Sequence, residues 1–253
     1  MAIRCDKCGR EYDVTLFQFG RTVRCDCGNT VTLSGVHTLR DLGAPTRFIL
    51  VRHGETDWNR ESRIQGQLPT HLNAQGRREA RMLARRLARE HAQNLFSSDL
   101  PRAMETAEPI AEAASLEIVA TPALREAHFG RWEGRSYDEV QQQFPGEFAS
   151  WVESDFHKAP PGGEPASALR ERVIAFLAEV AREHAGQTSI LVTHGGPCKY
   201  LIAHTLGISP TGVYRYAVDN ASIHVIEIGT CGWRLVTLND TCHLHGSGSR
   251  ARV

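Results

Sequence analysis

The sequence has no apolar run that could cross a membrane and no excess of charge of either sign. Its longest candidate runs, such as residues 48–51, are strand-sized, whereas a membrane helix needs about 20 apolar residues. Lysine plus arginine and aspartate plus glutamate number 29 each in 253 residues, which gives a formal net charge of zero. A balanced charge disfavours partners that are held by bulk electrostatics. We therefore expect neither a membrane nor a nucleic acid as a partner.

The sequence also has no secretory leader at its start and no even set of cysteines. Residues 1–6 contain no apolar segment of the kind found in signal peptides. An odd total of seven cysteines disfavours a disulfide framework. Together these absences predict a cytoplasmic protein with reduced thiols. The apolar fraction of 41% is sufficient for the core of a globular protein.

Four of the cysteines form two close pairs near the start of the chain. Their positions are Cys5, Cys8, Cys25 and Cys27, and a glycine follows each pair. Two thiolate pairs match the ligands of tetrahedral zinc, and the segment resembles a small zinc ribbon, although the second pair has one intervening residue where two are usual. About thirty residues cannot build a core without a metal or another staple. We therefore predict a closed, structural zinc site, with a redox pair or unligated thiols as the alternatives and a protein partner as a candidate role for the module.

Composition divides the chain into four segments. Residues 1–33 form the zinc-ribbon-like module, and residues 34–46 are predicted to be a linker. Residues 47–240 alternate between strand and helix patterns, although the stretch 128–166 is rich in glycine, proline and aromatics and is expected to be irregular. We expect the polar tail, residues 241–253, to be disordered. Alternation of strands and helices predicts an α/β fold with a sheet covered by helices on both faces.

Two predicted strands each end in a histidine followed by glycine. The apolar run 48–51 precedes Arg52-His53-Gly54, and the run 190–192 precedes Thr193-His194-Gly195. Ligands of open α/β sheets bind at the carboxyl ends of the strands. The sequence therefore predicts a ligand site that contains both histidines.

Further charged residues complete a candidate phosphoryl site. Arg102 follows Pro101 in the first turn of a predicted helix, and Glu126 lies in the segment LREAHFGRWEG. The guanidinium groups of Arg52 and Arg102 suit a doubly charged phosphoryl group, because their planar donor forks bind its oxygens in pairs. These residue types predict that the site handles a phosphoryl group.

Five motifs now occur in a characteristic order: RHGET-x-WN, R-x-QG, SSDLPRAMETA, LREAHFGRWEG and VTHGG. In this order the chain resembles the histidine phosphatase superfamily, the phosphoglycerate-mutase-like enzymes, from about residue 47 to residue 239. The resemblance implies a three-layer αβα sandwich with a mostly parallel sheet, to which this chain adds the small β-rich zinc ribbon.

The resemblance also implies roles for individual residues. His53 would be the nucleophile that becomes phosphohistidine, and Glu126 would be the proton donor. Arg52, Arg102 and a protonated His194 would hold the phosphoryl oxygens. The implied substrate-binding residues are Asn59, Gln65, Gly66 and Gly195.

Three other carboxylates lie in or between these motifs. Glu55 is an alternative proton donor, whereas Glu133 and Glu164 lie in predicted loops and are expected to be solvated.

The implied activity is that of a metal-independent phosphomonoesterase acting on a small phosphorylated metabolite, with no cofactor required for catalysis. One alternative is a cofactor-dependent mutase of the phosphoglycerate type. The other is an inactive phosphatase fold that binds a phospho-ligand or a protein. The phosphatase reading is favoured because the interval from Glu126 to His194 is short and holds few basic residues.

Overall fold

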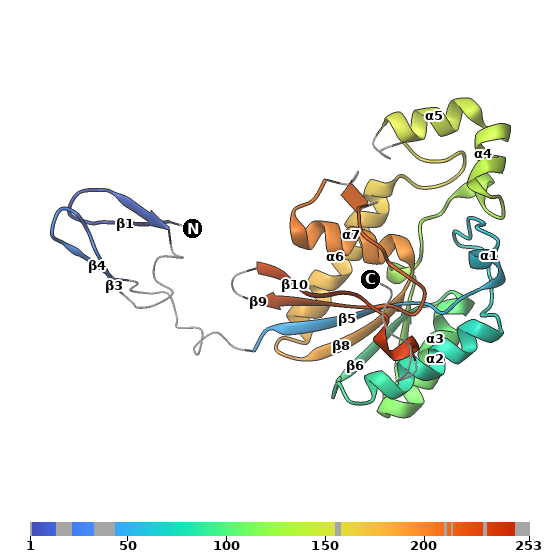
Figure 1. Ribbon diagram of the computed structural model, residues 1–253, viewed down its shortest axis with the longest axis horizontal. Helices are drawn as coiled ribbons and strands as arrows, with labels where there is room; N and C mark the ends of the chain where they lie inside the picture. Colours follow the sequence, from blue (N-terminus) through green and yellow to red (C-terminus); the bar gives the residue numbers. More distant parts are fainter. Residues whose placement is uncertain are drawn as a thin grey trace. The chain divides into compact units, whose positions relative to one another are not determined.

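The computed structural model describes most of the chain as two compact units. The described residues are 2–13, 22–32, 44–154, 158–209, 212–213, 215–229 and 232–245. The units comprise residues 1–43 and 44–253, and each is described by itself (Figure 1). The predicted linker lies outside the described residues except at its end, where Thr46 already begins the first strand of the larger unit.

The smaller unit contains two short antiparallel hairpins. Their strands are β1 (Ala2–Arg4), β2 (Glu11–Asp13), β3 (Thr22–Arg24) and β4 (Thr30–Thr32). Strand β1 pairs with β2 and β3 with β4, so each cysteine pair lies in the turn between two strands. The buried cluster of this unit contains Cys5, Cys25 and Val31. This confirms the predicted small β region.

The larger unit is built on one six-stranded sheet. The strands are β5 (Thr46–Arg52), β6 (Asn94–Ser98), β7 (Ile118–Thr121), β8 (Thr188–Thr193), β9 (Ile223–Gly229) and β10 (Gly232–Asp240). Their order is β10-β9-β5-β8-β6-β7. Strands β5, β8, β6 and β7 run parallel, whereas β9 is antiparallel to β5 and β10 to β9. The sheet is therefore mixed but mostly parallel, as expected.

Helices cover both faces of this sheet. The long ones are α2 (Ala74–Leu87), α3 (Pro101–Ala114), α6 (Ala166–Glu183) and α7 (Gly195–Leu206). Successive side chains of a strand point to opposite faces. Accordingly Phe48 and Leu50 of β5 belong to the core that includes residues of α6 and α7, while Ile49 and Val51 belong to the core that includes residues of α2 and α3. The three-layer α/β prediction is confirmed.

Three short helices lie outside these layers. They are α1 (Asp57–Arg60), α4 (Tyr137–Gln143) and α5 (Pro145–Glu153). Of these, α4 and α5 fall in the stretch that we expected to be irregular. Ser136 begins α4 with a capping box, and Trp132 and Trp151 pack edge to face at 5.4 Å in a third core cluster. Helices this short show too few turns for their apolar periodicity to be visible in the sequence.

The end of the described chain also differs from expectation. Residues 242–244 form a 3₁₀-helix, η5 (Cys242–Leu244), within the predicted tail. Leu244 packs against the core beside α2 and α3, so an apolar contact holds this turn. Across the described ranges, none of the helices combines the length and apolar character needed to span a bilayer.

Candidate active site

The carboxyl ends of the central strands bring the predicted site together. Strand β5 pairs with β8 in a register that sets Arg52 beside Thr193. The backbone N–H of His53 donates to the Thr193 carbonyl at 2.9 Å. The rings of His53 and His194, each directly after its strand, lie 5.2 Å apart between centroids.

The His53 imidazole is held in one neutral form. Its side chain is buried, and Nδ1 lies 2.7 Å from the Gly54 carbonyl oxygen. A carbonyl oxygen can only accept, so Nδ1 carries the proton and Nε2 keeps a free lone pair. Burial, followed by the charges of Arg102 and Arg52, lowers the pKa of His53 well below its ordinary value. The ring therefore offers an unprotonated nitrogen near neutral pH.

Arg102 is a buried cation held by one loop. Its Nη2 donates to the Gly66 carbonyl at 2.7 Å, and its Nη1 donates to the Leu68 carbonyl and to Thr70 Oγ1, both at 3.1 Å. Burial lowers its pKa to about 10, against the opposing attraction of Glu126. Among the described residues its Nε has no hydrogen-bond partner. A buried donor without an acceptor is rare and costly, which indicates an anion site.

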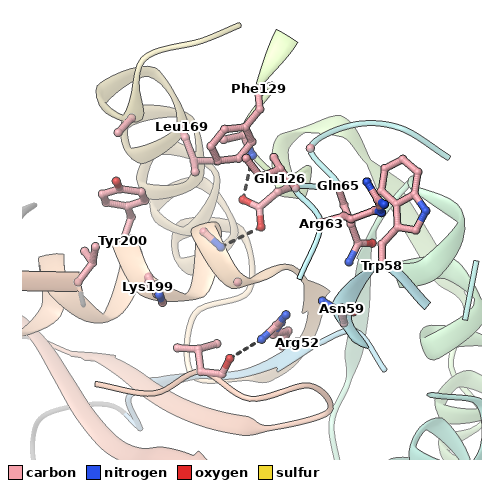
Figure 2. Close-up of a pocket in the computed structure, with 18 of the residues that line it drawn as sticks. Arg52, Trp58, Asn59, Arg63, Gln65, Glu126, Phe129, Leu169, Lys199 and Tyr200 are labelled. Carbon is pink, nitrogen blue, oxygen red and sulfur yellow. Dashed lines mark hydrogen bonds between the residues drawn. The ribbon is translucent and has the colours of Figure 1, made fainter. Parts of the chain in front are cut away.

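Arg52 is a second buried cation with one N–H group left without an acceptor. Its Nη1 donates to the Val218 carbonyl at 2.6 Å (Figure 2), and its Nε also lacks an acceptor within the described ranges. Burial lowers its pKa, and the charge of Glu126 opposes this effect. Two guanidinium groups therefore line one cavity with uncommitted N–H groups.

Burial disfavours the protonated form of His194. The side chain is fully buried, and burial and the Arg102 charge are the first causes that lower its pKa well below the ordinary value. Its Nε2 lies 2.8 Å from Ser98 Oγ, which already accepts from the Leu100 N–H at 3.3 Å. A serine hydroxyl can both donate and accept, and where it donates to Nε2 the imidazole proton lies on Nδ1. Nδ1 has no partner in the part of the chain that is described. The resemblance implied a protonated His194, whereas burial opposes that form here.

Glu126 is fixed by two backbone donors. Its Oε1 accepts from the Ala127 N–H at 2.9 Å and its Oε2 from the Gly196 N–H at 3.0 Å. A Cβ at residue 196 would lie 2.1 Å from Oε1, and a Cβ at residue 195 would meet Arg52 Nε at 3.7 Å. The glycine at 196 therefore leaves room for the carboxylate, whereas a Cβ at 195 would make only ordinary van der Waals contact with the guanidinium.

Three of the four predicted binding residues lie in the 56–66 segment and are oriented by their neighbours. Asn59 Oδ1 accepts from Thr56 N at 3.1 Å and from Thr56 Oγ1 at 3.0 Å. Gln65 Oε1 accepts from Thr70 Oγ1 at 2.7 Å. Gly66 has φ +52°, and a Cβ there would lie 2.0 Å from Glu133 Oε1, so only glycine fits.

These residues surround a cavity of about 500 Å³. Figure 2 shows Glu126 in its middle, with Arg52 and Asn59 below. Except for His194, all nine predicted residues of the phosphoryl site line it: Arg52, His53, Asn59, Gln65, Gly66, Arg102, Glu126 and Gly195. His194 contacts the His53 ring from outside the lining.

Sequence reasoning missed several residues of this cavity. Trp58 and Phe129 belong to quoted motifs but had no role assigned, while Lys199 and Tyr200 follow the His-Gly-Gly segment on α7. The position of Lys199 and Tyr200 in the sequence could have indicated them, because residues in the first turns of a helix stay close to the strand-end motif that precedes it. Asn220, whose amide donates to the His53 carbonyl, had no sequence signal.

Glu133 and Glu164 are not solvated as expected, and Glu55, the alternative proton donor, is bonded outside the cavity. Glu55 Oε1 accepts from Asn73 Nδ2 at 2.7 Å, and Glu55 does not line the cavity. Glu133 is buried rather than solvated, because its Oε1 accepts the Gln67 and Phe129 N–H groups, both at 3.0 Å. Glu164 is likewise engaged, by Arg172 Nη2 and the His128 N–H, both at 2.9 Å.

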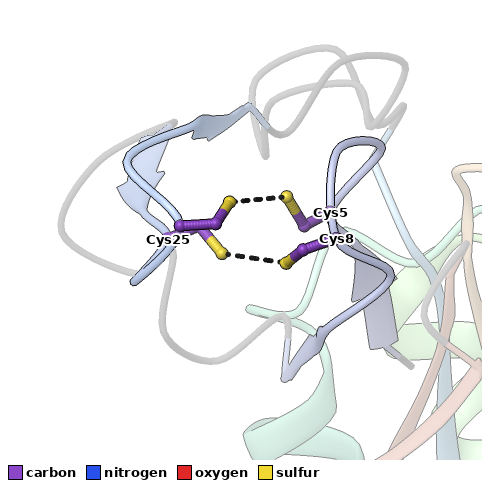
Figure 3. A group of neighbouring side chains, drawn as sticks. Cys5, Cys8 and Cys25 are labelled. Carbon is purple, nitrogen blue, oxygen red and sulfur yellow. Dashed lines mark hydrogen bonds between the residues drawn. The ribbon is translucent and has the colours of Figure 1, made fainter.

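The four N-terminal cysteines converge in the smaller unit (Figure 3). Their Sγ atoms all lie within 4.8 Å of one another, with 3.8 Å between Cys5 and Cys27 and 3.4 Å between Cys8 and Cys25. Tetrahedral zinc with Zn–S bonds of about 2.3 Å requires S–S separations of about 3.8 Å. Gly9 and Gly28 take φ values of +75° and +82° directly after each pair. The donor set therefore fits a tetrahedral metal.

Comparison with known proteins now defines the class. Residues 48–241 match the model of the "Histidine phosphatase superfamily (branch 1)". The chain belongs to this superfamily.

Individual relatives refine the comparison. Phosphoserine phosphatase 1 of Hydrogenobacter thermophilus is 37% identical over 198 residues, which cover 78% of this chain and 94% of that protein. The metal-independent phosphoserine phosphatase of Arabidopsis thaliana is 34% identical, over 80% of this chain and 85% of its own length. "Probable phosphoglycerate mutase GpmB" of Serratia proteamaculans is 34% identical, over 77% of this chain and 93% of its own length.

A solved structure agrees with these relatives. Mycobacterial glucosyl-3-phosphoglycerate phosphatase, in complex with VO₃, aligns with a TM-score of 0.70 and 33% identity, over 78% of this chain and all of that chain. Because the chain belongs to this superfamily and its relatives include phosphatases, it is a phosphomonoesterase of the histidine phosphatase superfamily.

Proposed function

We propose that this chain hydrolyses the phosphomonoester of a small metabolite through a phosphohistidine on His53, without a catalytic metal. One observation carries the proposal: three buried nitrogens beside the neutral His53 ring have no partner among the described residues. They are Nε of Arg52, Nε of Arg102 and Nδ1 of His194. A bound phosphoryl group would give each of them an acceptor.

The proposed reaction has two steps. In the first, His53 Nε2 attacks phosphorus in line, the N–P bond forms as the ester P–O bond breaks, and protonated Glu126 gives its proton to the leaving alkoxide. In the second, Glu126 takes a proton from water, the water oxygen bonds to phosphorus, and the N–P bond breaks to release phosphate. His53 returns to its neutral form.

Positive charge for both steps would come from the protein itself. The guanidinium groups of Arg52 and Arg102 face the transferring group in a water-poor site, where fixed charges stabilise a developing anion strongly. A relative of this chain is named as metal-independent, which supports the same conclusion.

The experiment that tests the proposal is a trapped phosphoenzyme. The protein would be mixed with ³²P-labelled p-nitrophenyl phosphate in EDTA, quenched in base and digested. We expect an acid-labile label on the peptide that contains His53, and turnover that persists in the chelator. Label on a different peptide, or turnover with no label, would contradict the proposal.

A mutase is the second candidate, because relatives carry that name. A mutase would pass the phosphoryl group from the histidine to a second sugar-acid hydroxyl rather than to water. With 3-phosphoglycerate and bisphosphoglycerate we expect release of inorganic phosphate and no phosphoryl exchange between isomers. Exchange without net phosphate release would establish the mutase.

We also propose that Cys5, Cys8, Cys25 and Cys27 hold a structural zinc ion. The S–S separations and the glycine turns support this assignment. Docking of a protein partner on the ribbon stays a prediction.

Glu126→Gln should slow substrates with poor leaving groups most. An amide cannot give a proton, so the first step with an alkyl phosphate should fall by about 10²–10⁴-fold. p-Nitrophenolate leaves without a proton, so its burst phase should be affected far less. Stopped-flow bursts and alkyl phosphate single turnovers measure the two rates. The control is Glu55→Gln, which should leave both rates near wild type; a leaving-group dependence in that variant instead would move the donor role to Glu55.

The cavity should favour an ester that carries a ring. In Figure 2 Trp58 lies on one side of Glu126, and Phe129 and Tyr200 lie on the other. A volume of about 500 Å³ encloses more than a phosphoryl group. We expect kcat/KM for 2-phenylethyl phosphate to exceed that for ethyl phosphate by about 10–100-fold, from apolar burial and aromatic contacts. The two leaving alcohols are chemically similar, and Trp58→Ala should shrink the ratio. Equal values for both esters would show that the aromatic walls do not contact the leaving group.

A further inference from the structure

The turn formed by residues 218–222 lies against the end of β5 and contacts the site through one side chain. Asn220 Nδ2 lies 3.1 Å from the His53 carbonyl oxygen, 3.3 Å from the Gly54 carbonyl oxygen and 3.2 Å from Asn59 Oδ1. All three neighbours are acceptors, so this atom is the NH₂ group of Asn220. One amide therefore joins the segment that carries the nucleophile to the segment that carries Asn59.

The contact with Gly54 bears on the form of the nucleophile. The Gly54 carbonyl is the acceptor of the His53 Nδ1 proton at 2.7 Å. It is therefore the group that keeps the proton on Nδ1 and the lone pair on Nε2. Asn220 donates to the same oxygen and so restricts the direction in which the carbonyl points.

The contact with Asn59 bears on phosphoryl binding. Thr56 N, Thr56 Oγ1 and Asn220 Nδ2 all donate to one terminal atom of Asn59, which is therefore the oxygen. Asn59 lines the cavity. With its oxygen committed to three donors, the group it can offer to a phosphoryl oxygen is its NH₂.

The turn that carries Asn220 is held in a costly conformation. Ala221 has φ +55° and is fully buried, and its N–H donates to the His53 carbonyl at 3.1 Å. The Ser222 carbonyl accepts from the Arg52 N–H at 3.2 Å. A buried, β-carbon-bearing residue in the left-handed region persists only where its surroundings fix it, and such residues cluster at functional sites.

We propose that Asn220 is a positioning residue that fixes the reactive tautomer of His53 and the donor orientation of Asn59. This inference rests on the proposed role of His53 as the nucleophile. Asn220 does not itself need to touch substrate.

The first test removes the amide. Asn220→Ala should lower kcat by about 10–100-fold, the loss expected when buried carbonyls lose a donor. Asn220→Asp should lose at least as much, because a carboxylate would face three oxygens. The direct readout is ¹⁵N NMR of the His53 ring, whose signals are assigned because they are missing from the spectrum of His53→Ala. The wild-type ring should carry its proton on Nδ1, whereas both variants should populate the form protonated on Nε2.

The matched control loosens the same turn without touching the site. Asn239 holds Asp219 through two hydrogen bonds of 2.8 Å, and its φ of +52° suits glycine. Asn239→Gly should therefore keep kcat within about twofold of wild type, since glycine relieves rather than adds strain. The inference would be overturned if Asn239→Gly lost as much kcat as Asn220→Ala and the His53 tautomer were unchanged in both variants. The loss in Asn220→Ala would then be explained by a general loosening of the turn.

A double-mutant cycle tests the contact with Asn59. If Asn220 acts partly through Asn59, the loss in Asn59→Ala/Asn220→Ala should be smaller than the product of the two single losses. Full multiplicativity would remove the Asn59 part of the inference. Failure of the proposed function is visible separately, because the wild-type protein would then form no phosphohistidine, whatever the tautomer of His53.

Discussion

His53→Ala is expected to abolish turnover, with kcat falling by about 10⁴-fold or more, the scale seen when a covalent nucleophile is removed. Alanine offers no lone pair to attack phosphorus, and the Nε2 atom of the next imidazole, His194, lies within hydrogen-bond distance of Ser98 Oγ. The measurement is hydrolysis of p-nitrophenyl phosphate, together with loss of the acid-labile label. Binding of inorganic phosphate should survive, because Arg52, Arg102 and His194 remain.

The control is His245→Ala, which removes an exposed histidine outside the site and should leave kcat unchanged. Thermal unfolding of both variants shows whether the fold is kept. A folded His53→Ala protein with activity within about tenfold of wild type would assign the nucleophile elsewhere.

His53→Ala should also change how the free energy of unfolding responds to acid. Burial lowers the pKa of His53 and His194 well below the ordinary value and that of His224 to about 4. Below about pH 6.5 the unfolded chain binds protons at these positions and the folded chain does not, so the free energy of unfolding falls as the pH falls. Above that pH their contribution is complete. His53→Ala should therefore lose less stability between pH 7 and pH 5 than the wild-type protein, as measured by denaturant unfolding.

The parts of the site that could be predicted are those fixed by local sequence. His53 and His194 each follow, after one intervening residue, an apolar run that is buried on both faces, as strands of a covered parallel sheet are. Adjacent parallel strands end at one edge, so the two rings had to lie close together. Arg102 follows Pro101 at the start of α3, which sets its place relative to β6. In each case a strand or helix end determines the position.

The parts that could not be predicted depend on contacts between distant segments. Glu133 lies in a glycine-rich loop typical of solvated residues, yet its burial comes from the Gln67 and Phe129 N–H groups. Asn220 reaches the site from more than 160 residues along the chain, with no periodic pattern around it. Leu244 is one apolar residue in a polar tail, and only the core beside α2 and α3 gives it a place. Hydrogen bonds and single apolar contacts of this kind leave no periodic signal in a sequence.

Removal of zinc is expected to unfold the N-terminal unit while phosphatase activity persists. The buried cluster of that unit contains Cys5, Cys25 and Val31, with Tyr12, Val23 and Cys27 packed against it. A core of this size cannot offset the conformational entropy of the chain that it orders. Binding of structural zinc contributes about 10–16 kcal/mol in comparable small modules, and that free energy becomes folding free energy.

The measurement is the ¹H–¹⁵N spectrum of the full chain before and after treatment with a strong zinc chelator, with metal content determined in parallel. We expect one zinc per chain, loss of dispersed signals from residues 2–13 and 22–32 on chelation, and an unchanged kcat. Cys25→Ser should reproduce the loss, whereas Cys242→Ser, which changes an exposed thiol outside the cluster, should not. Dispersed signals that survive in metal-free protein would mean that the hairpins fold without a metal. We do not expect a catalytic role for the metal, because four thiolate ligands leave no open coordination position. A fall in kcat on chelation that zinc reverses would contradict this expectation.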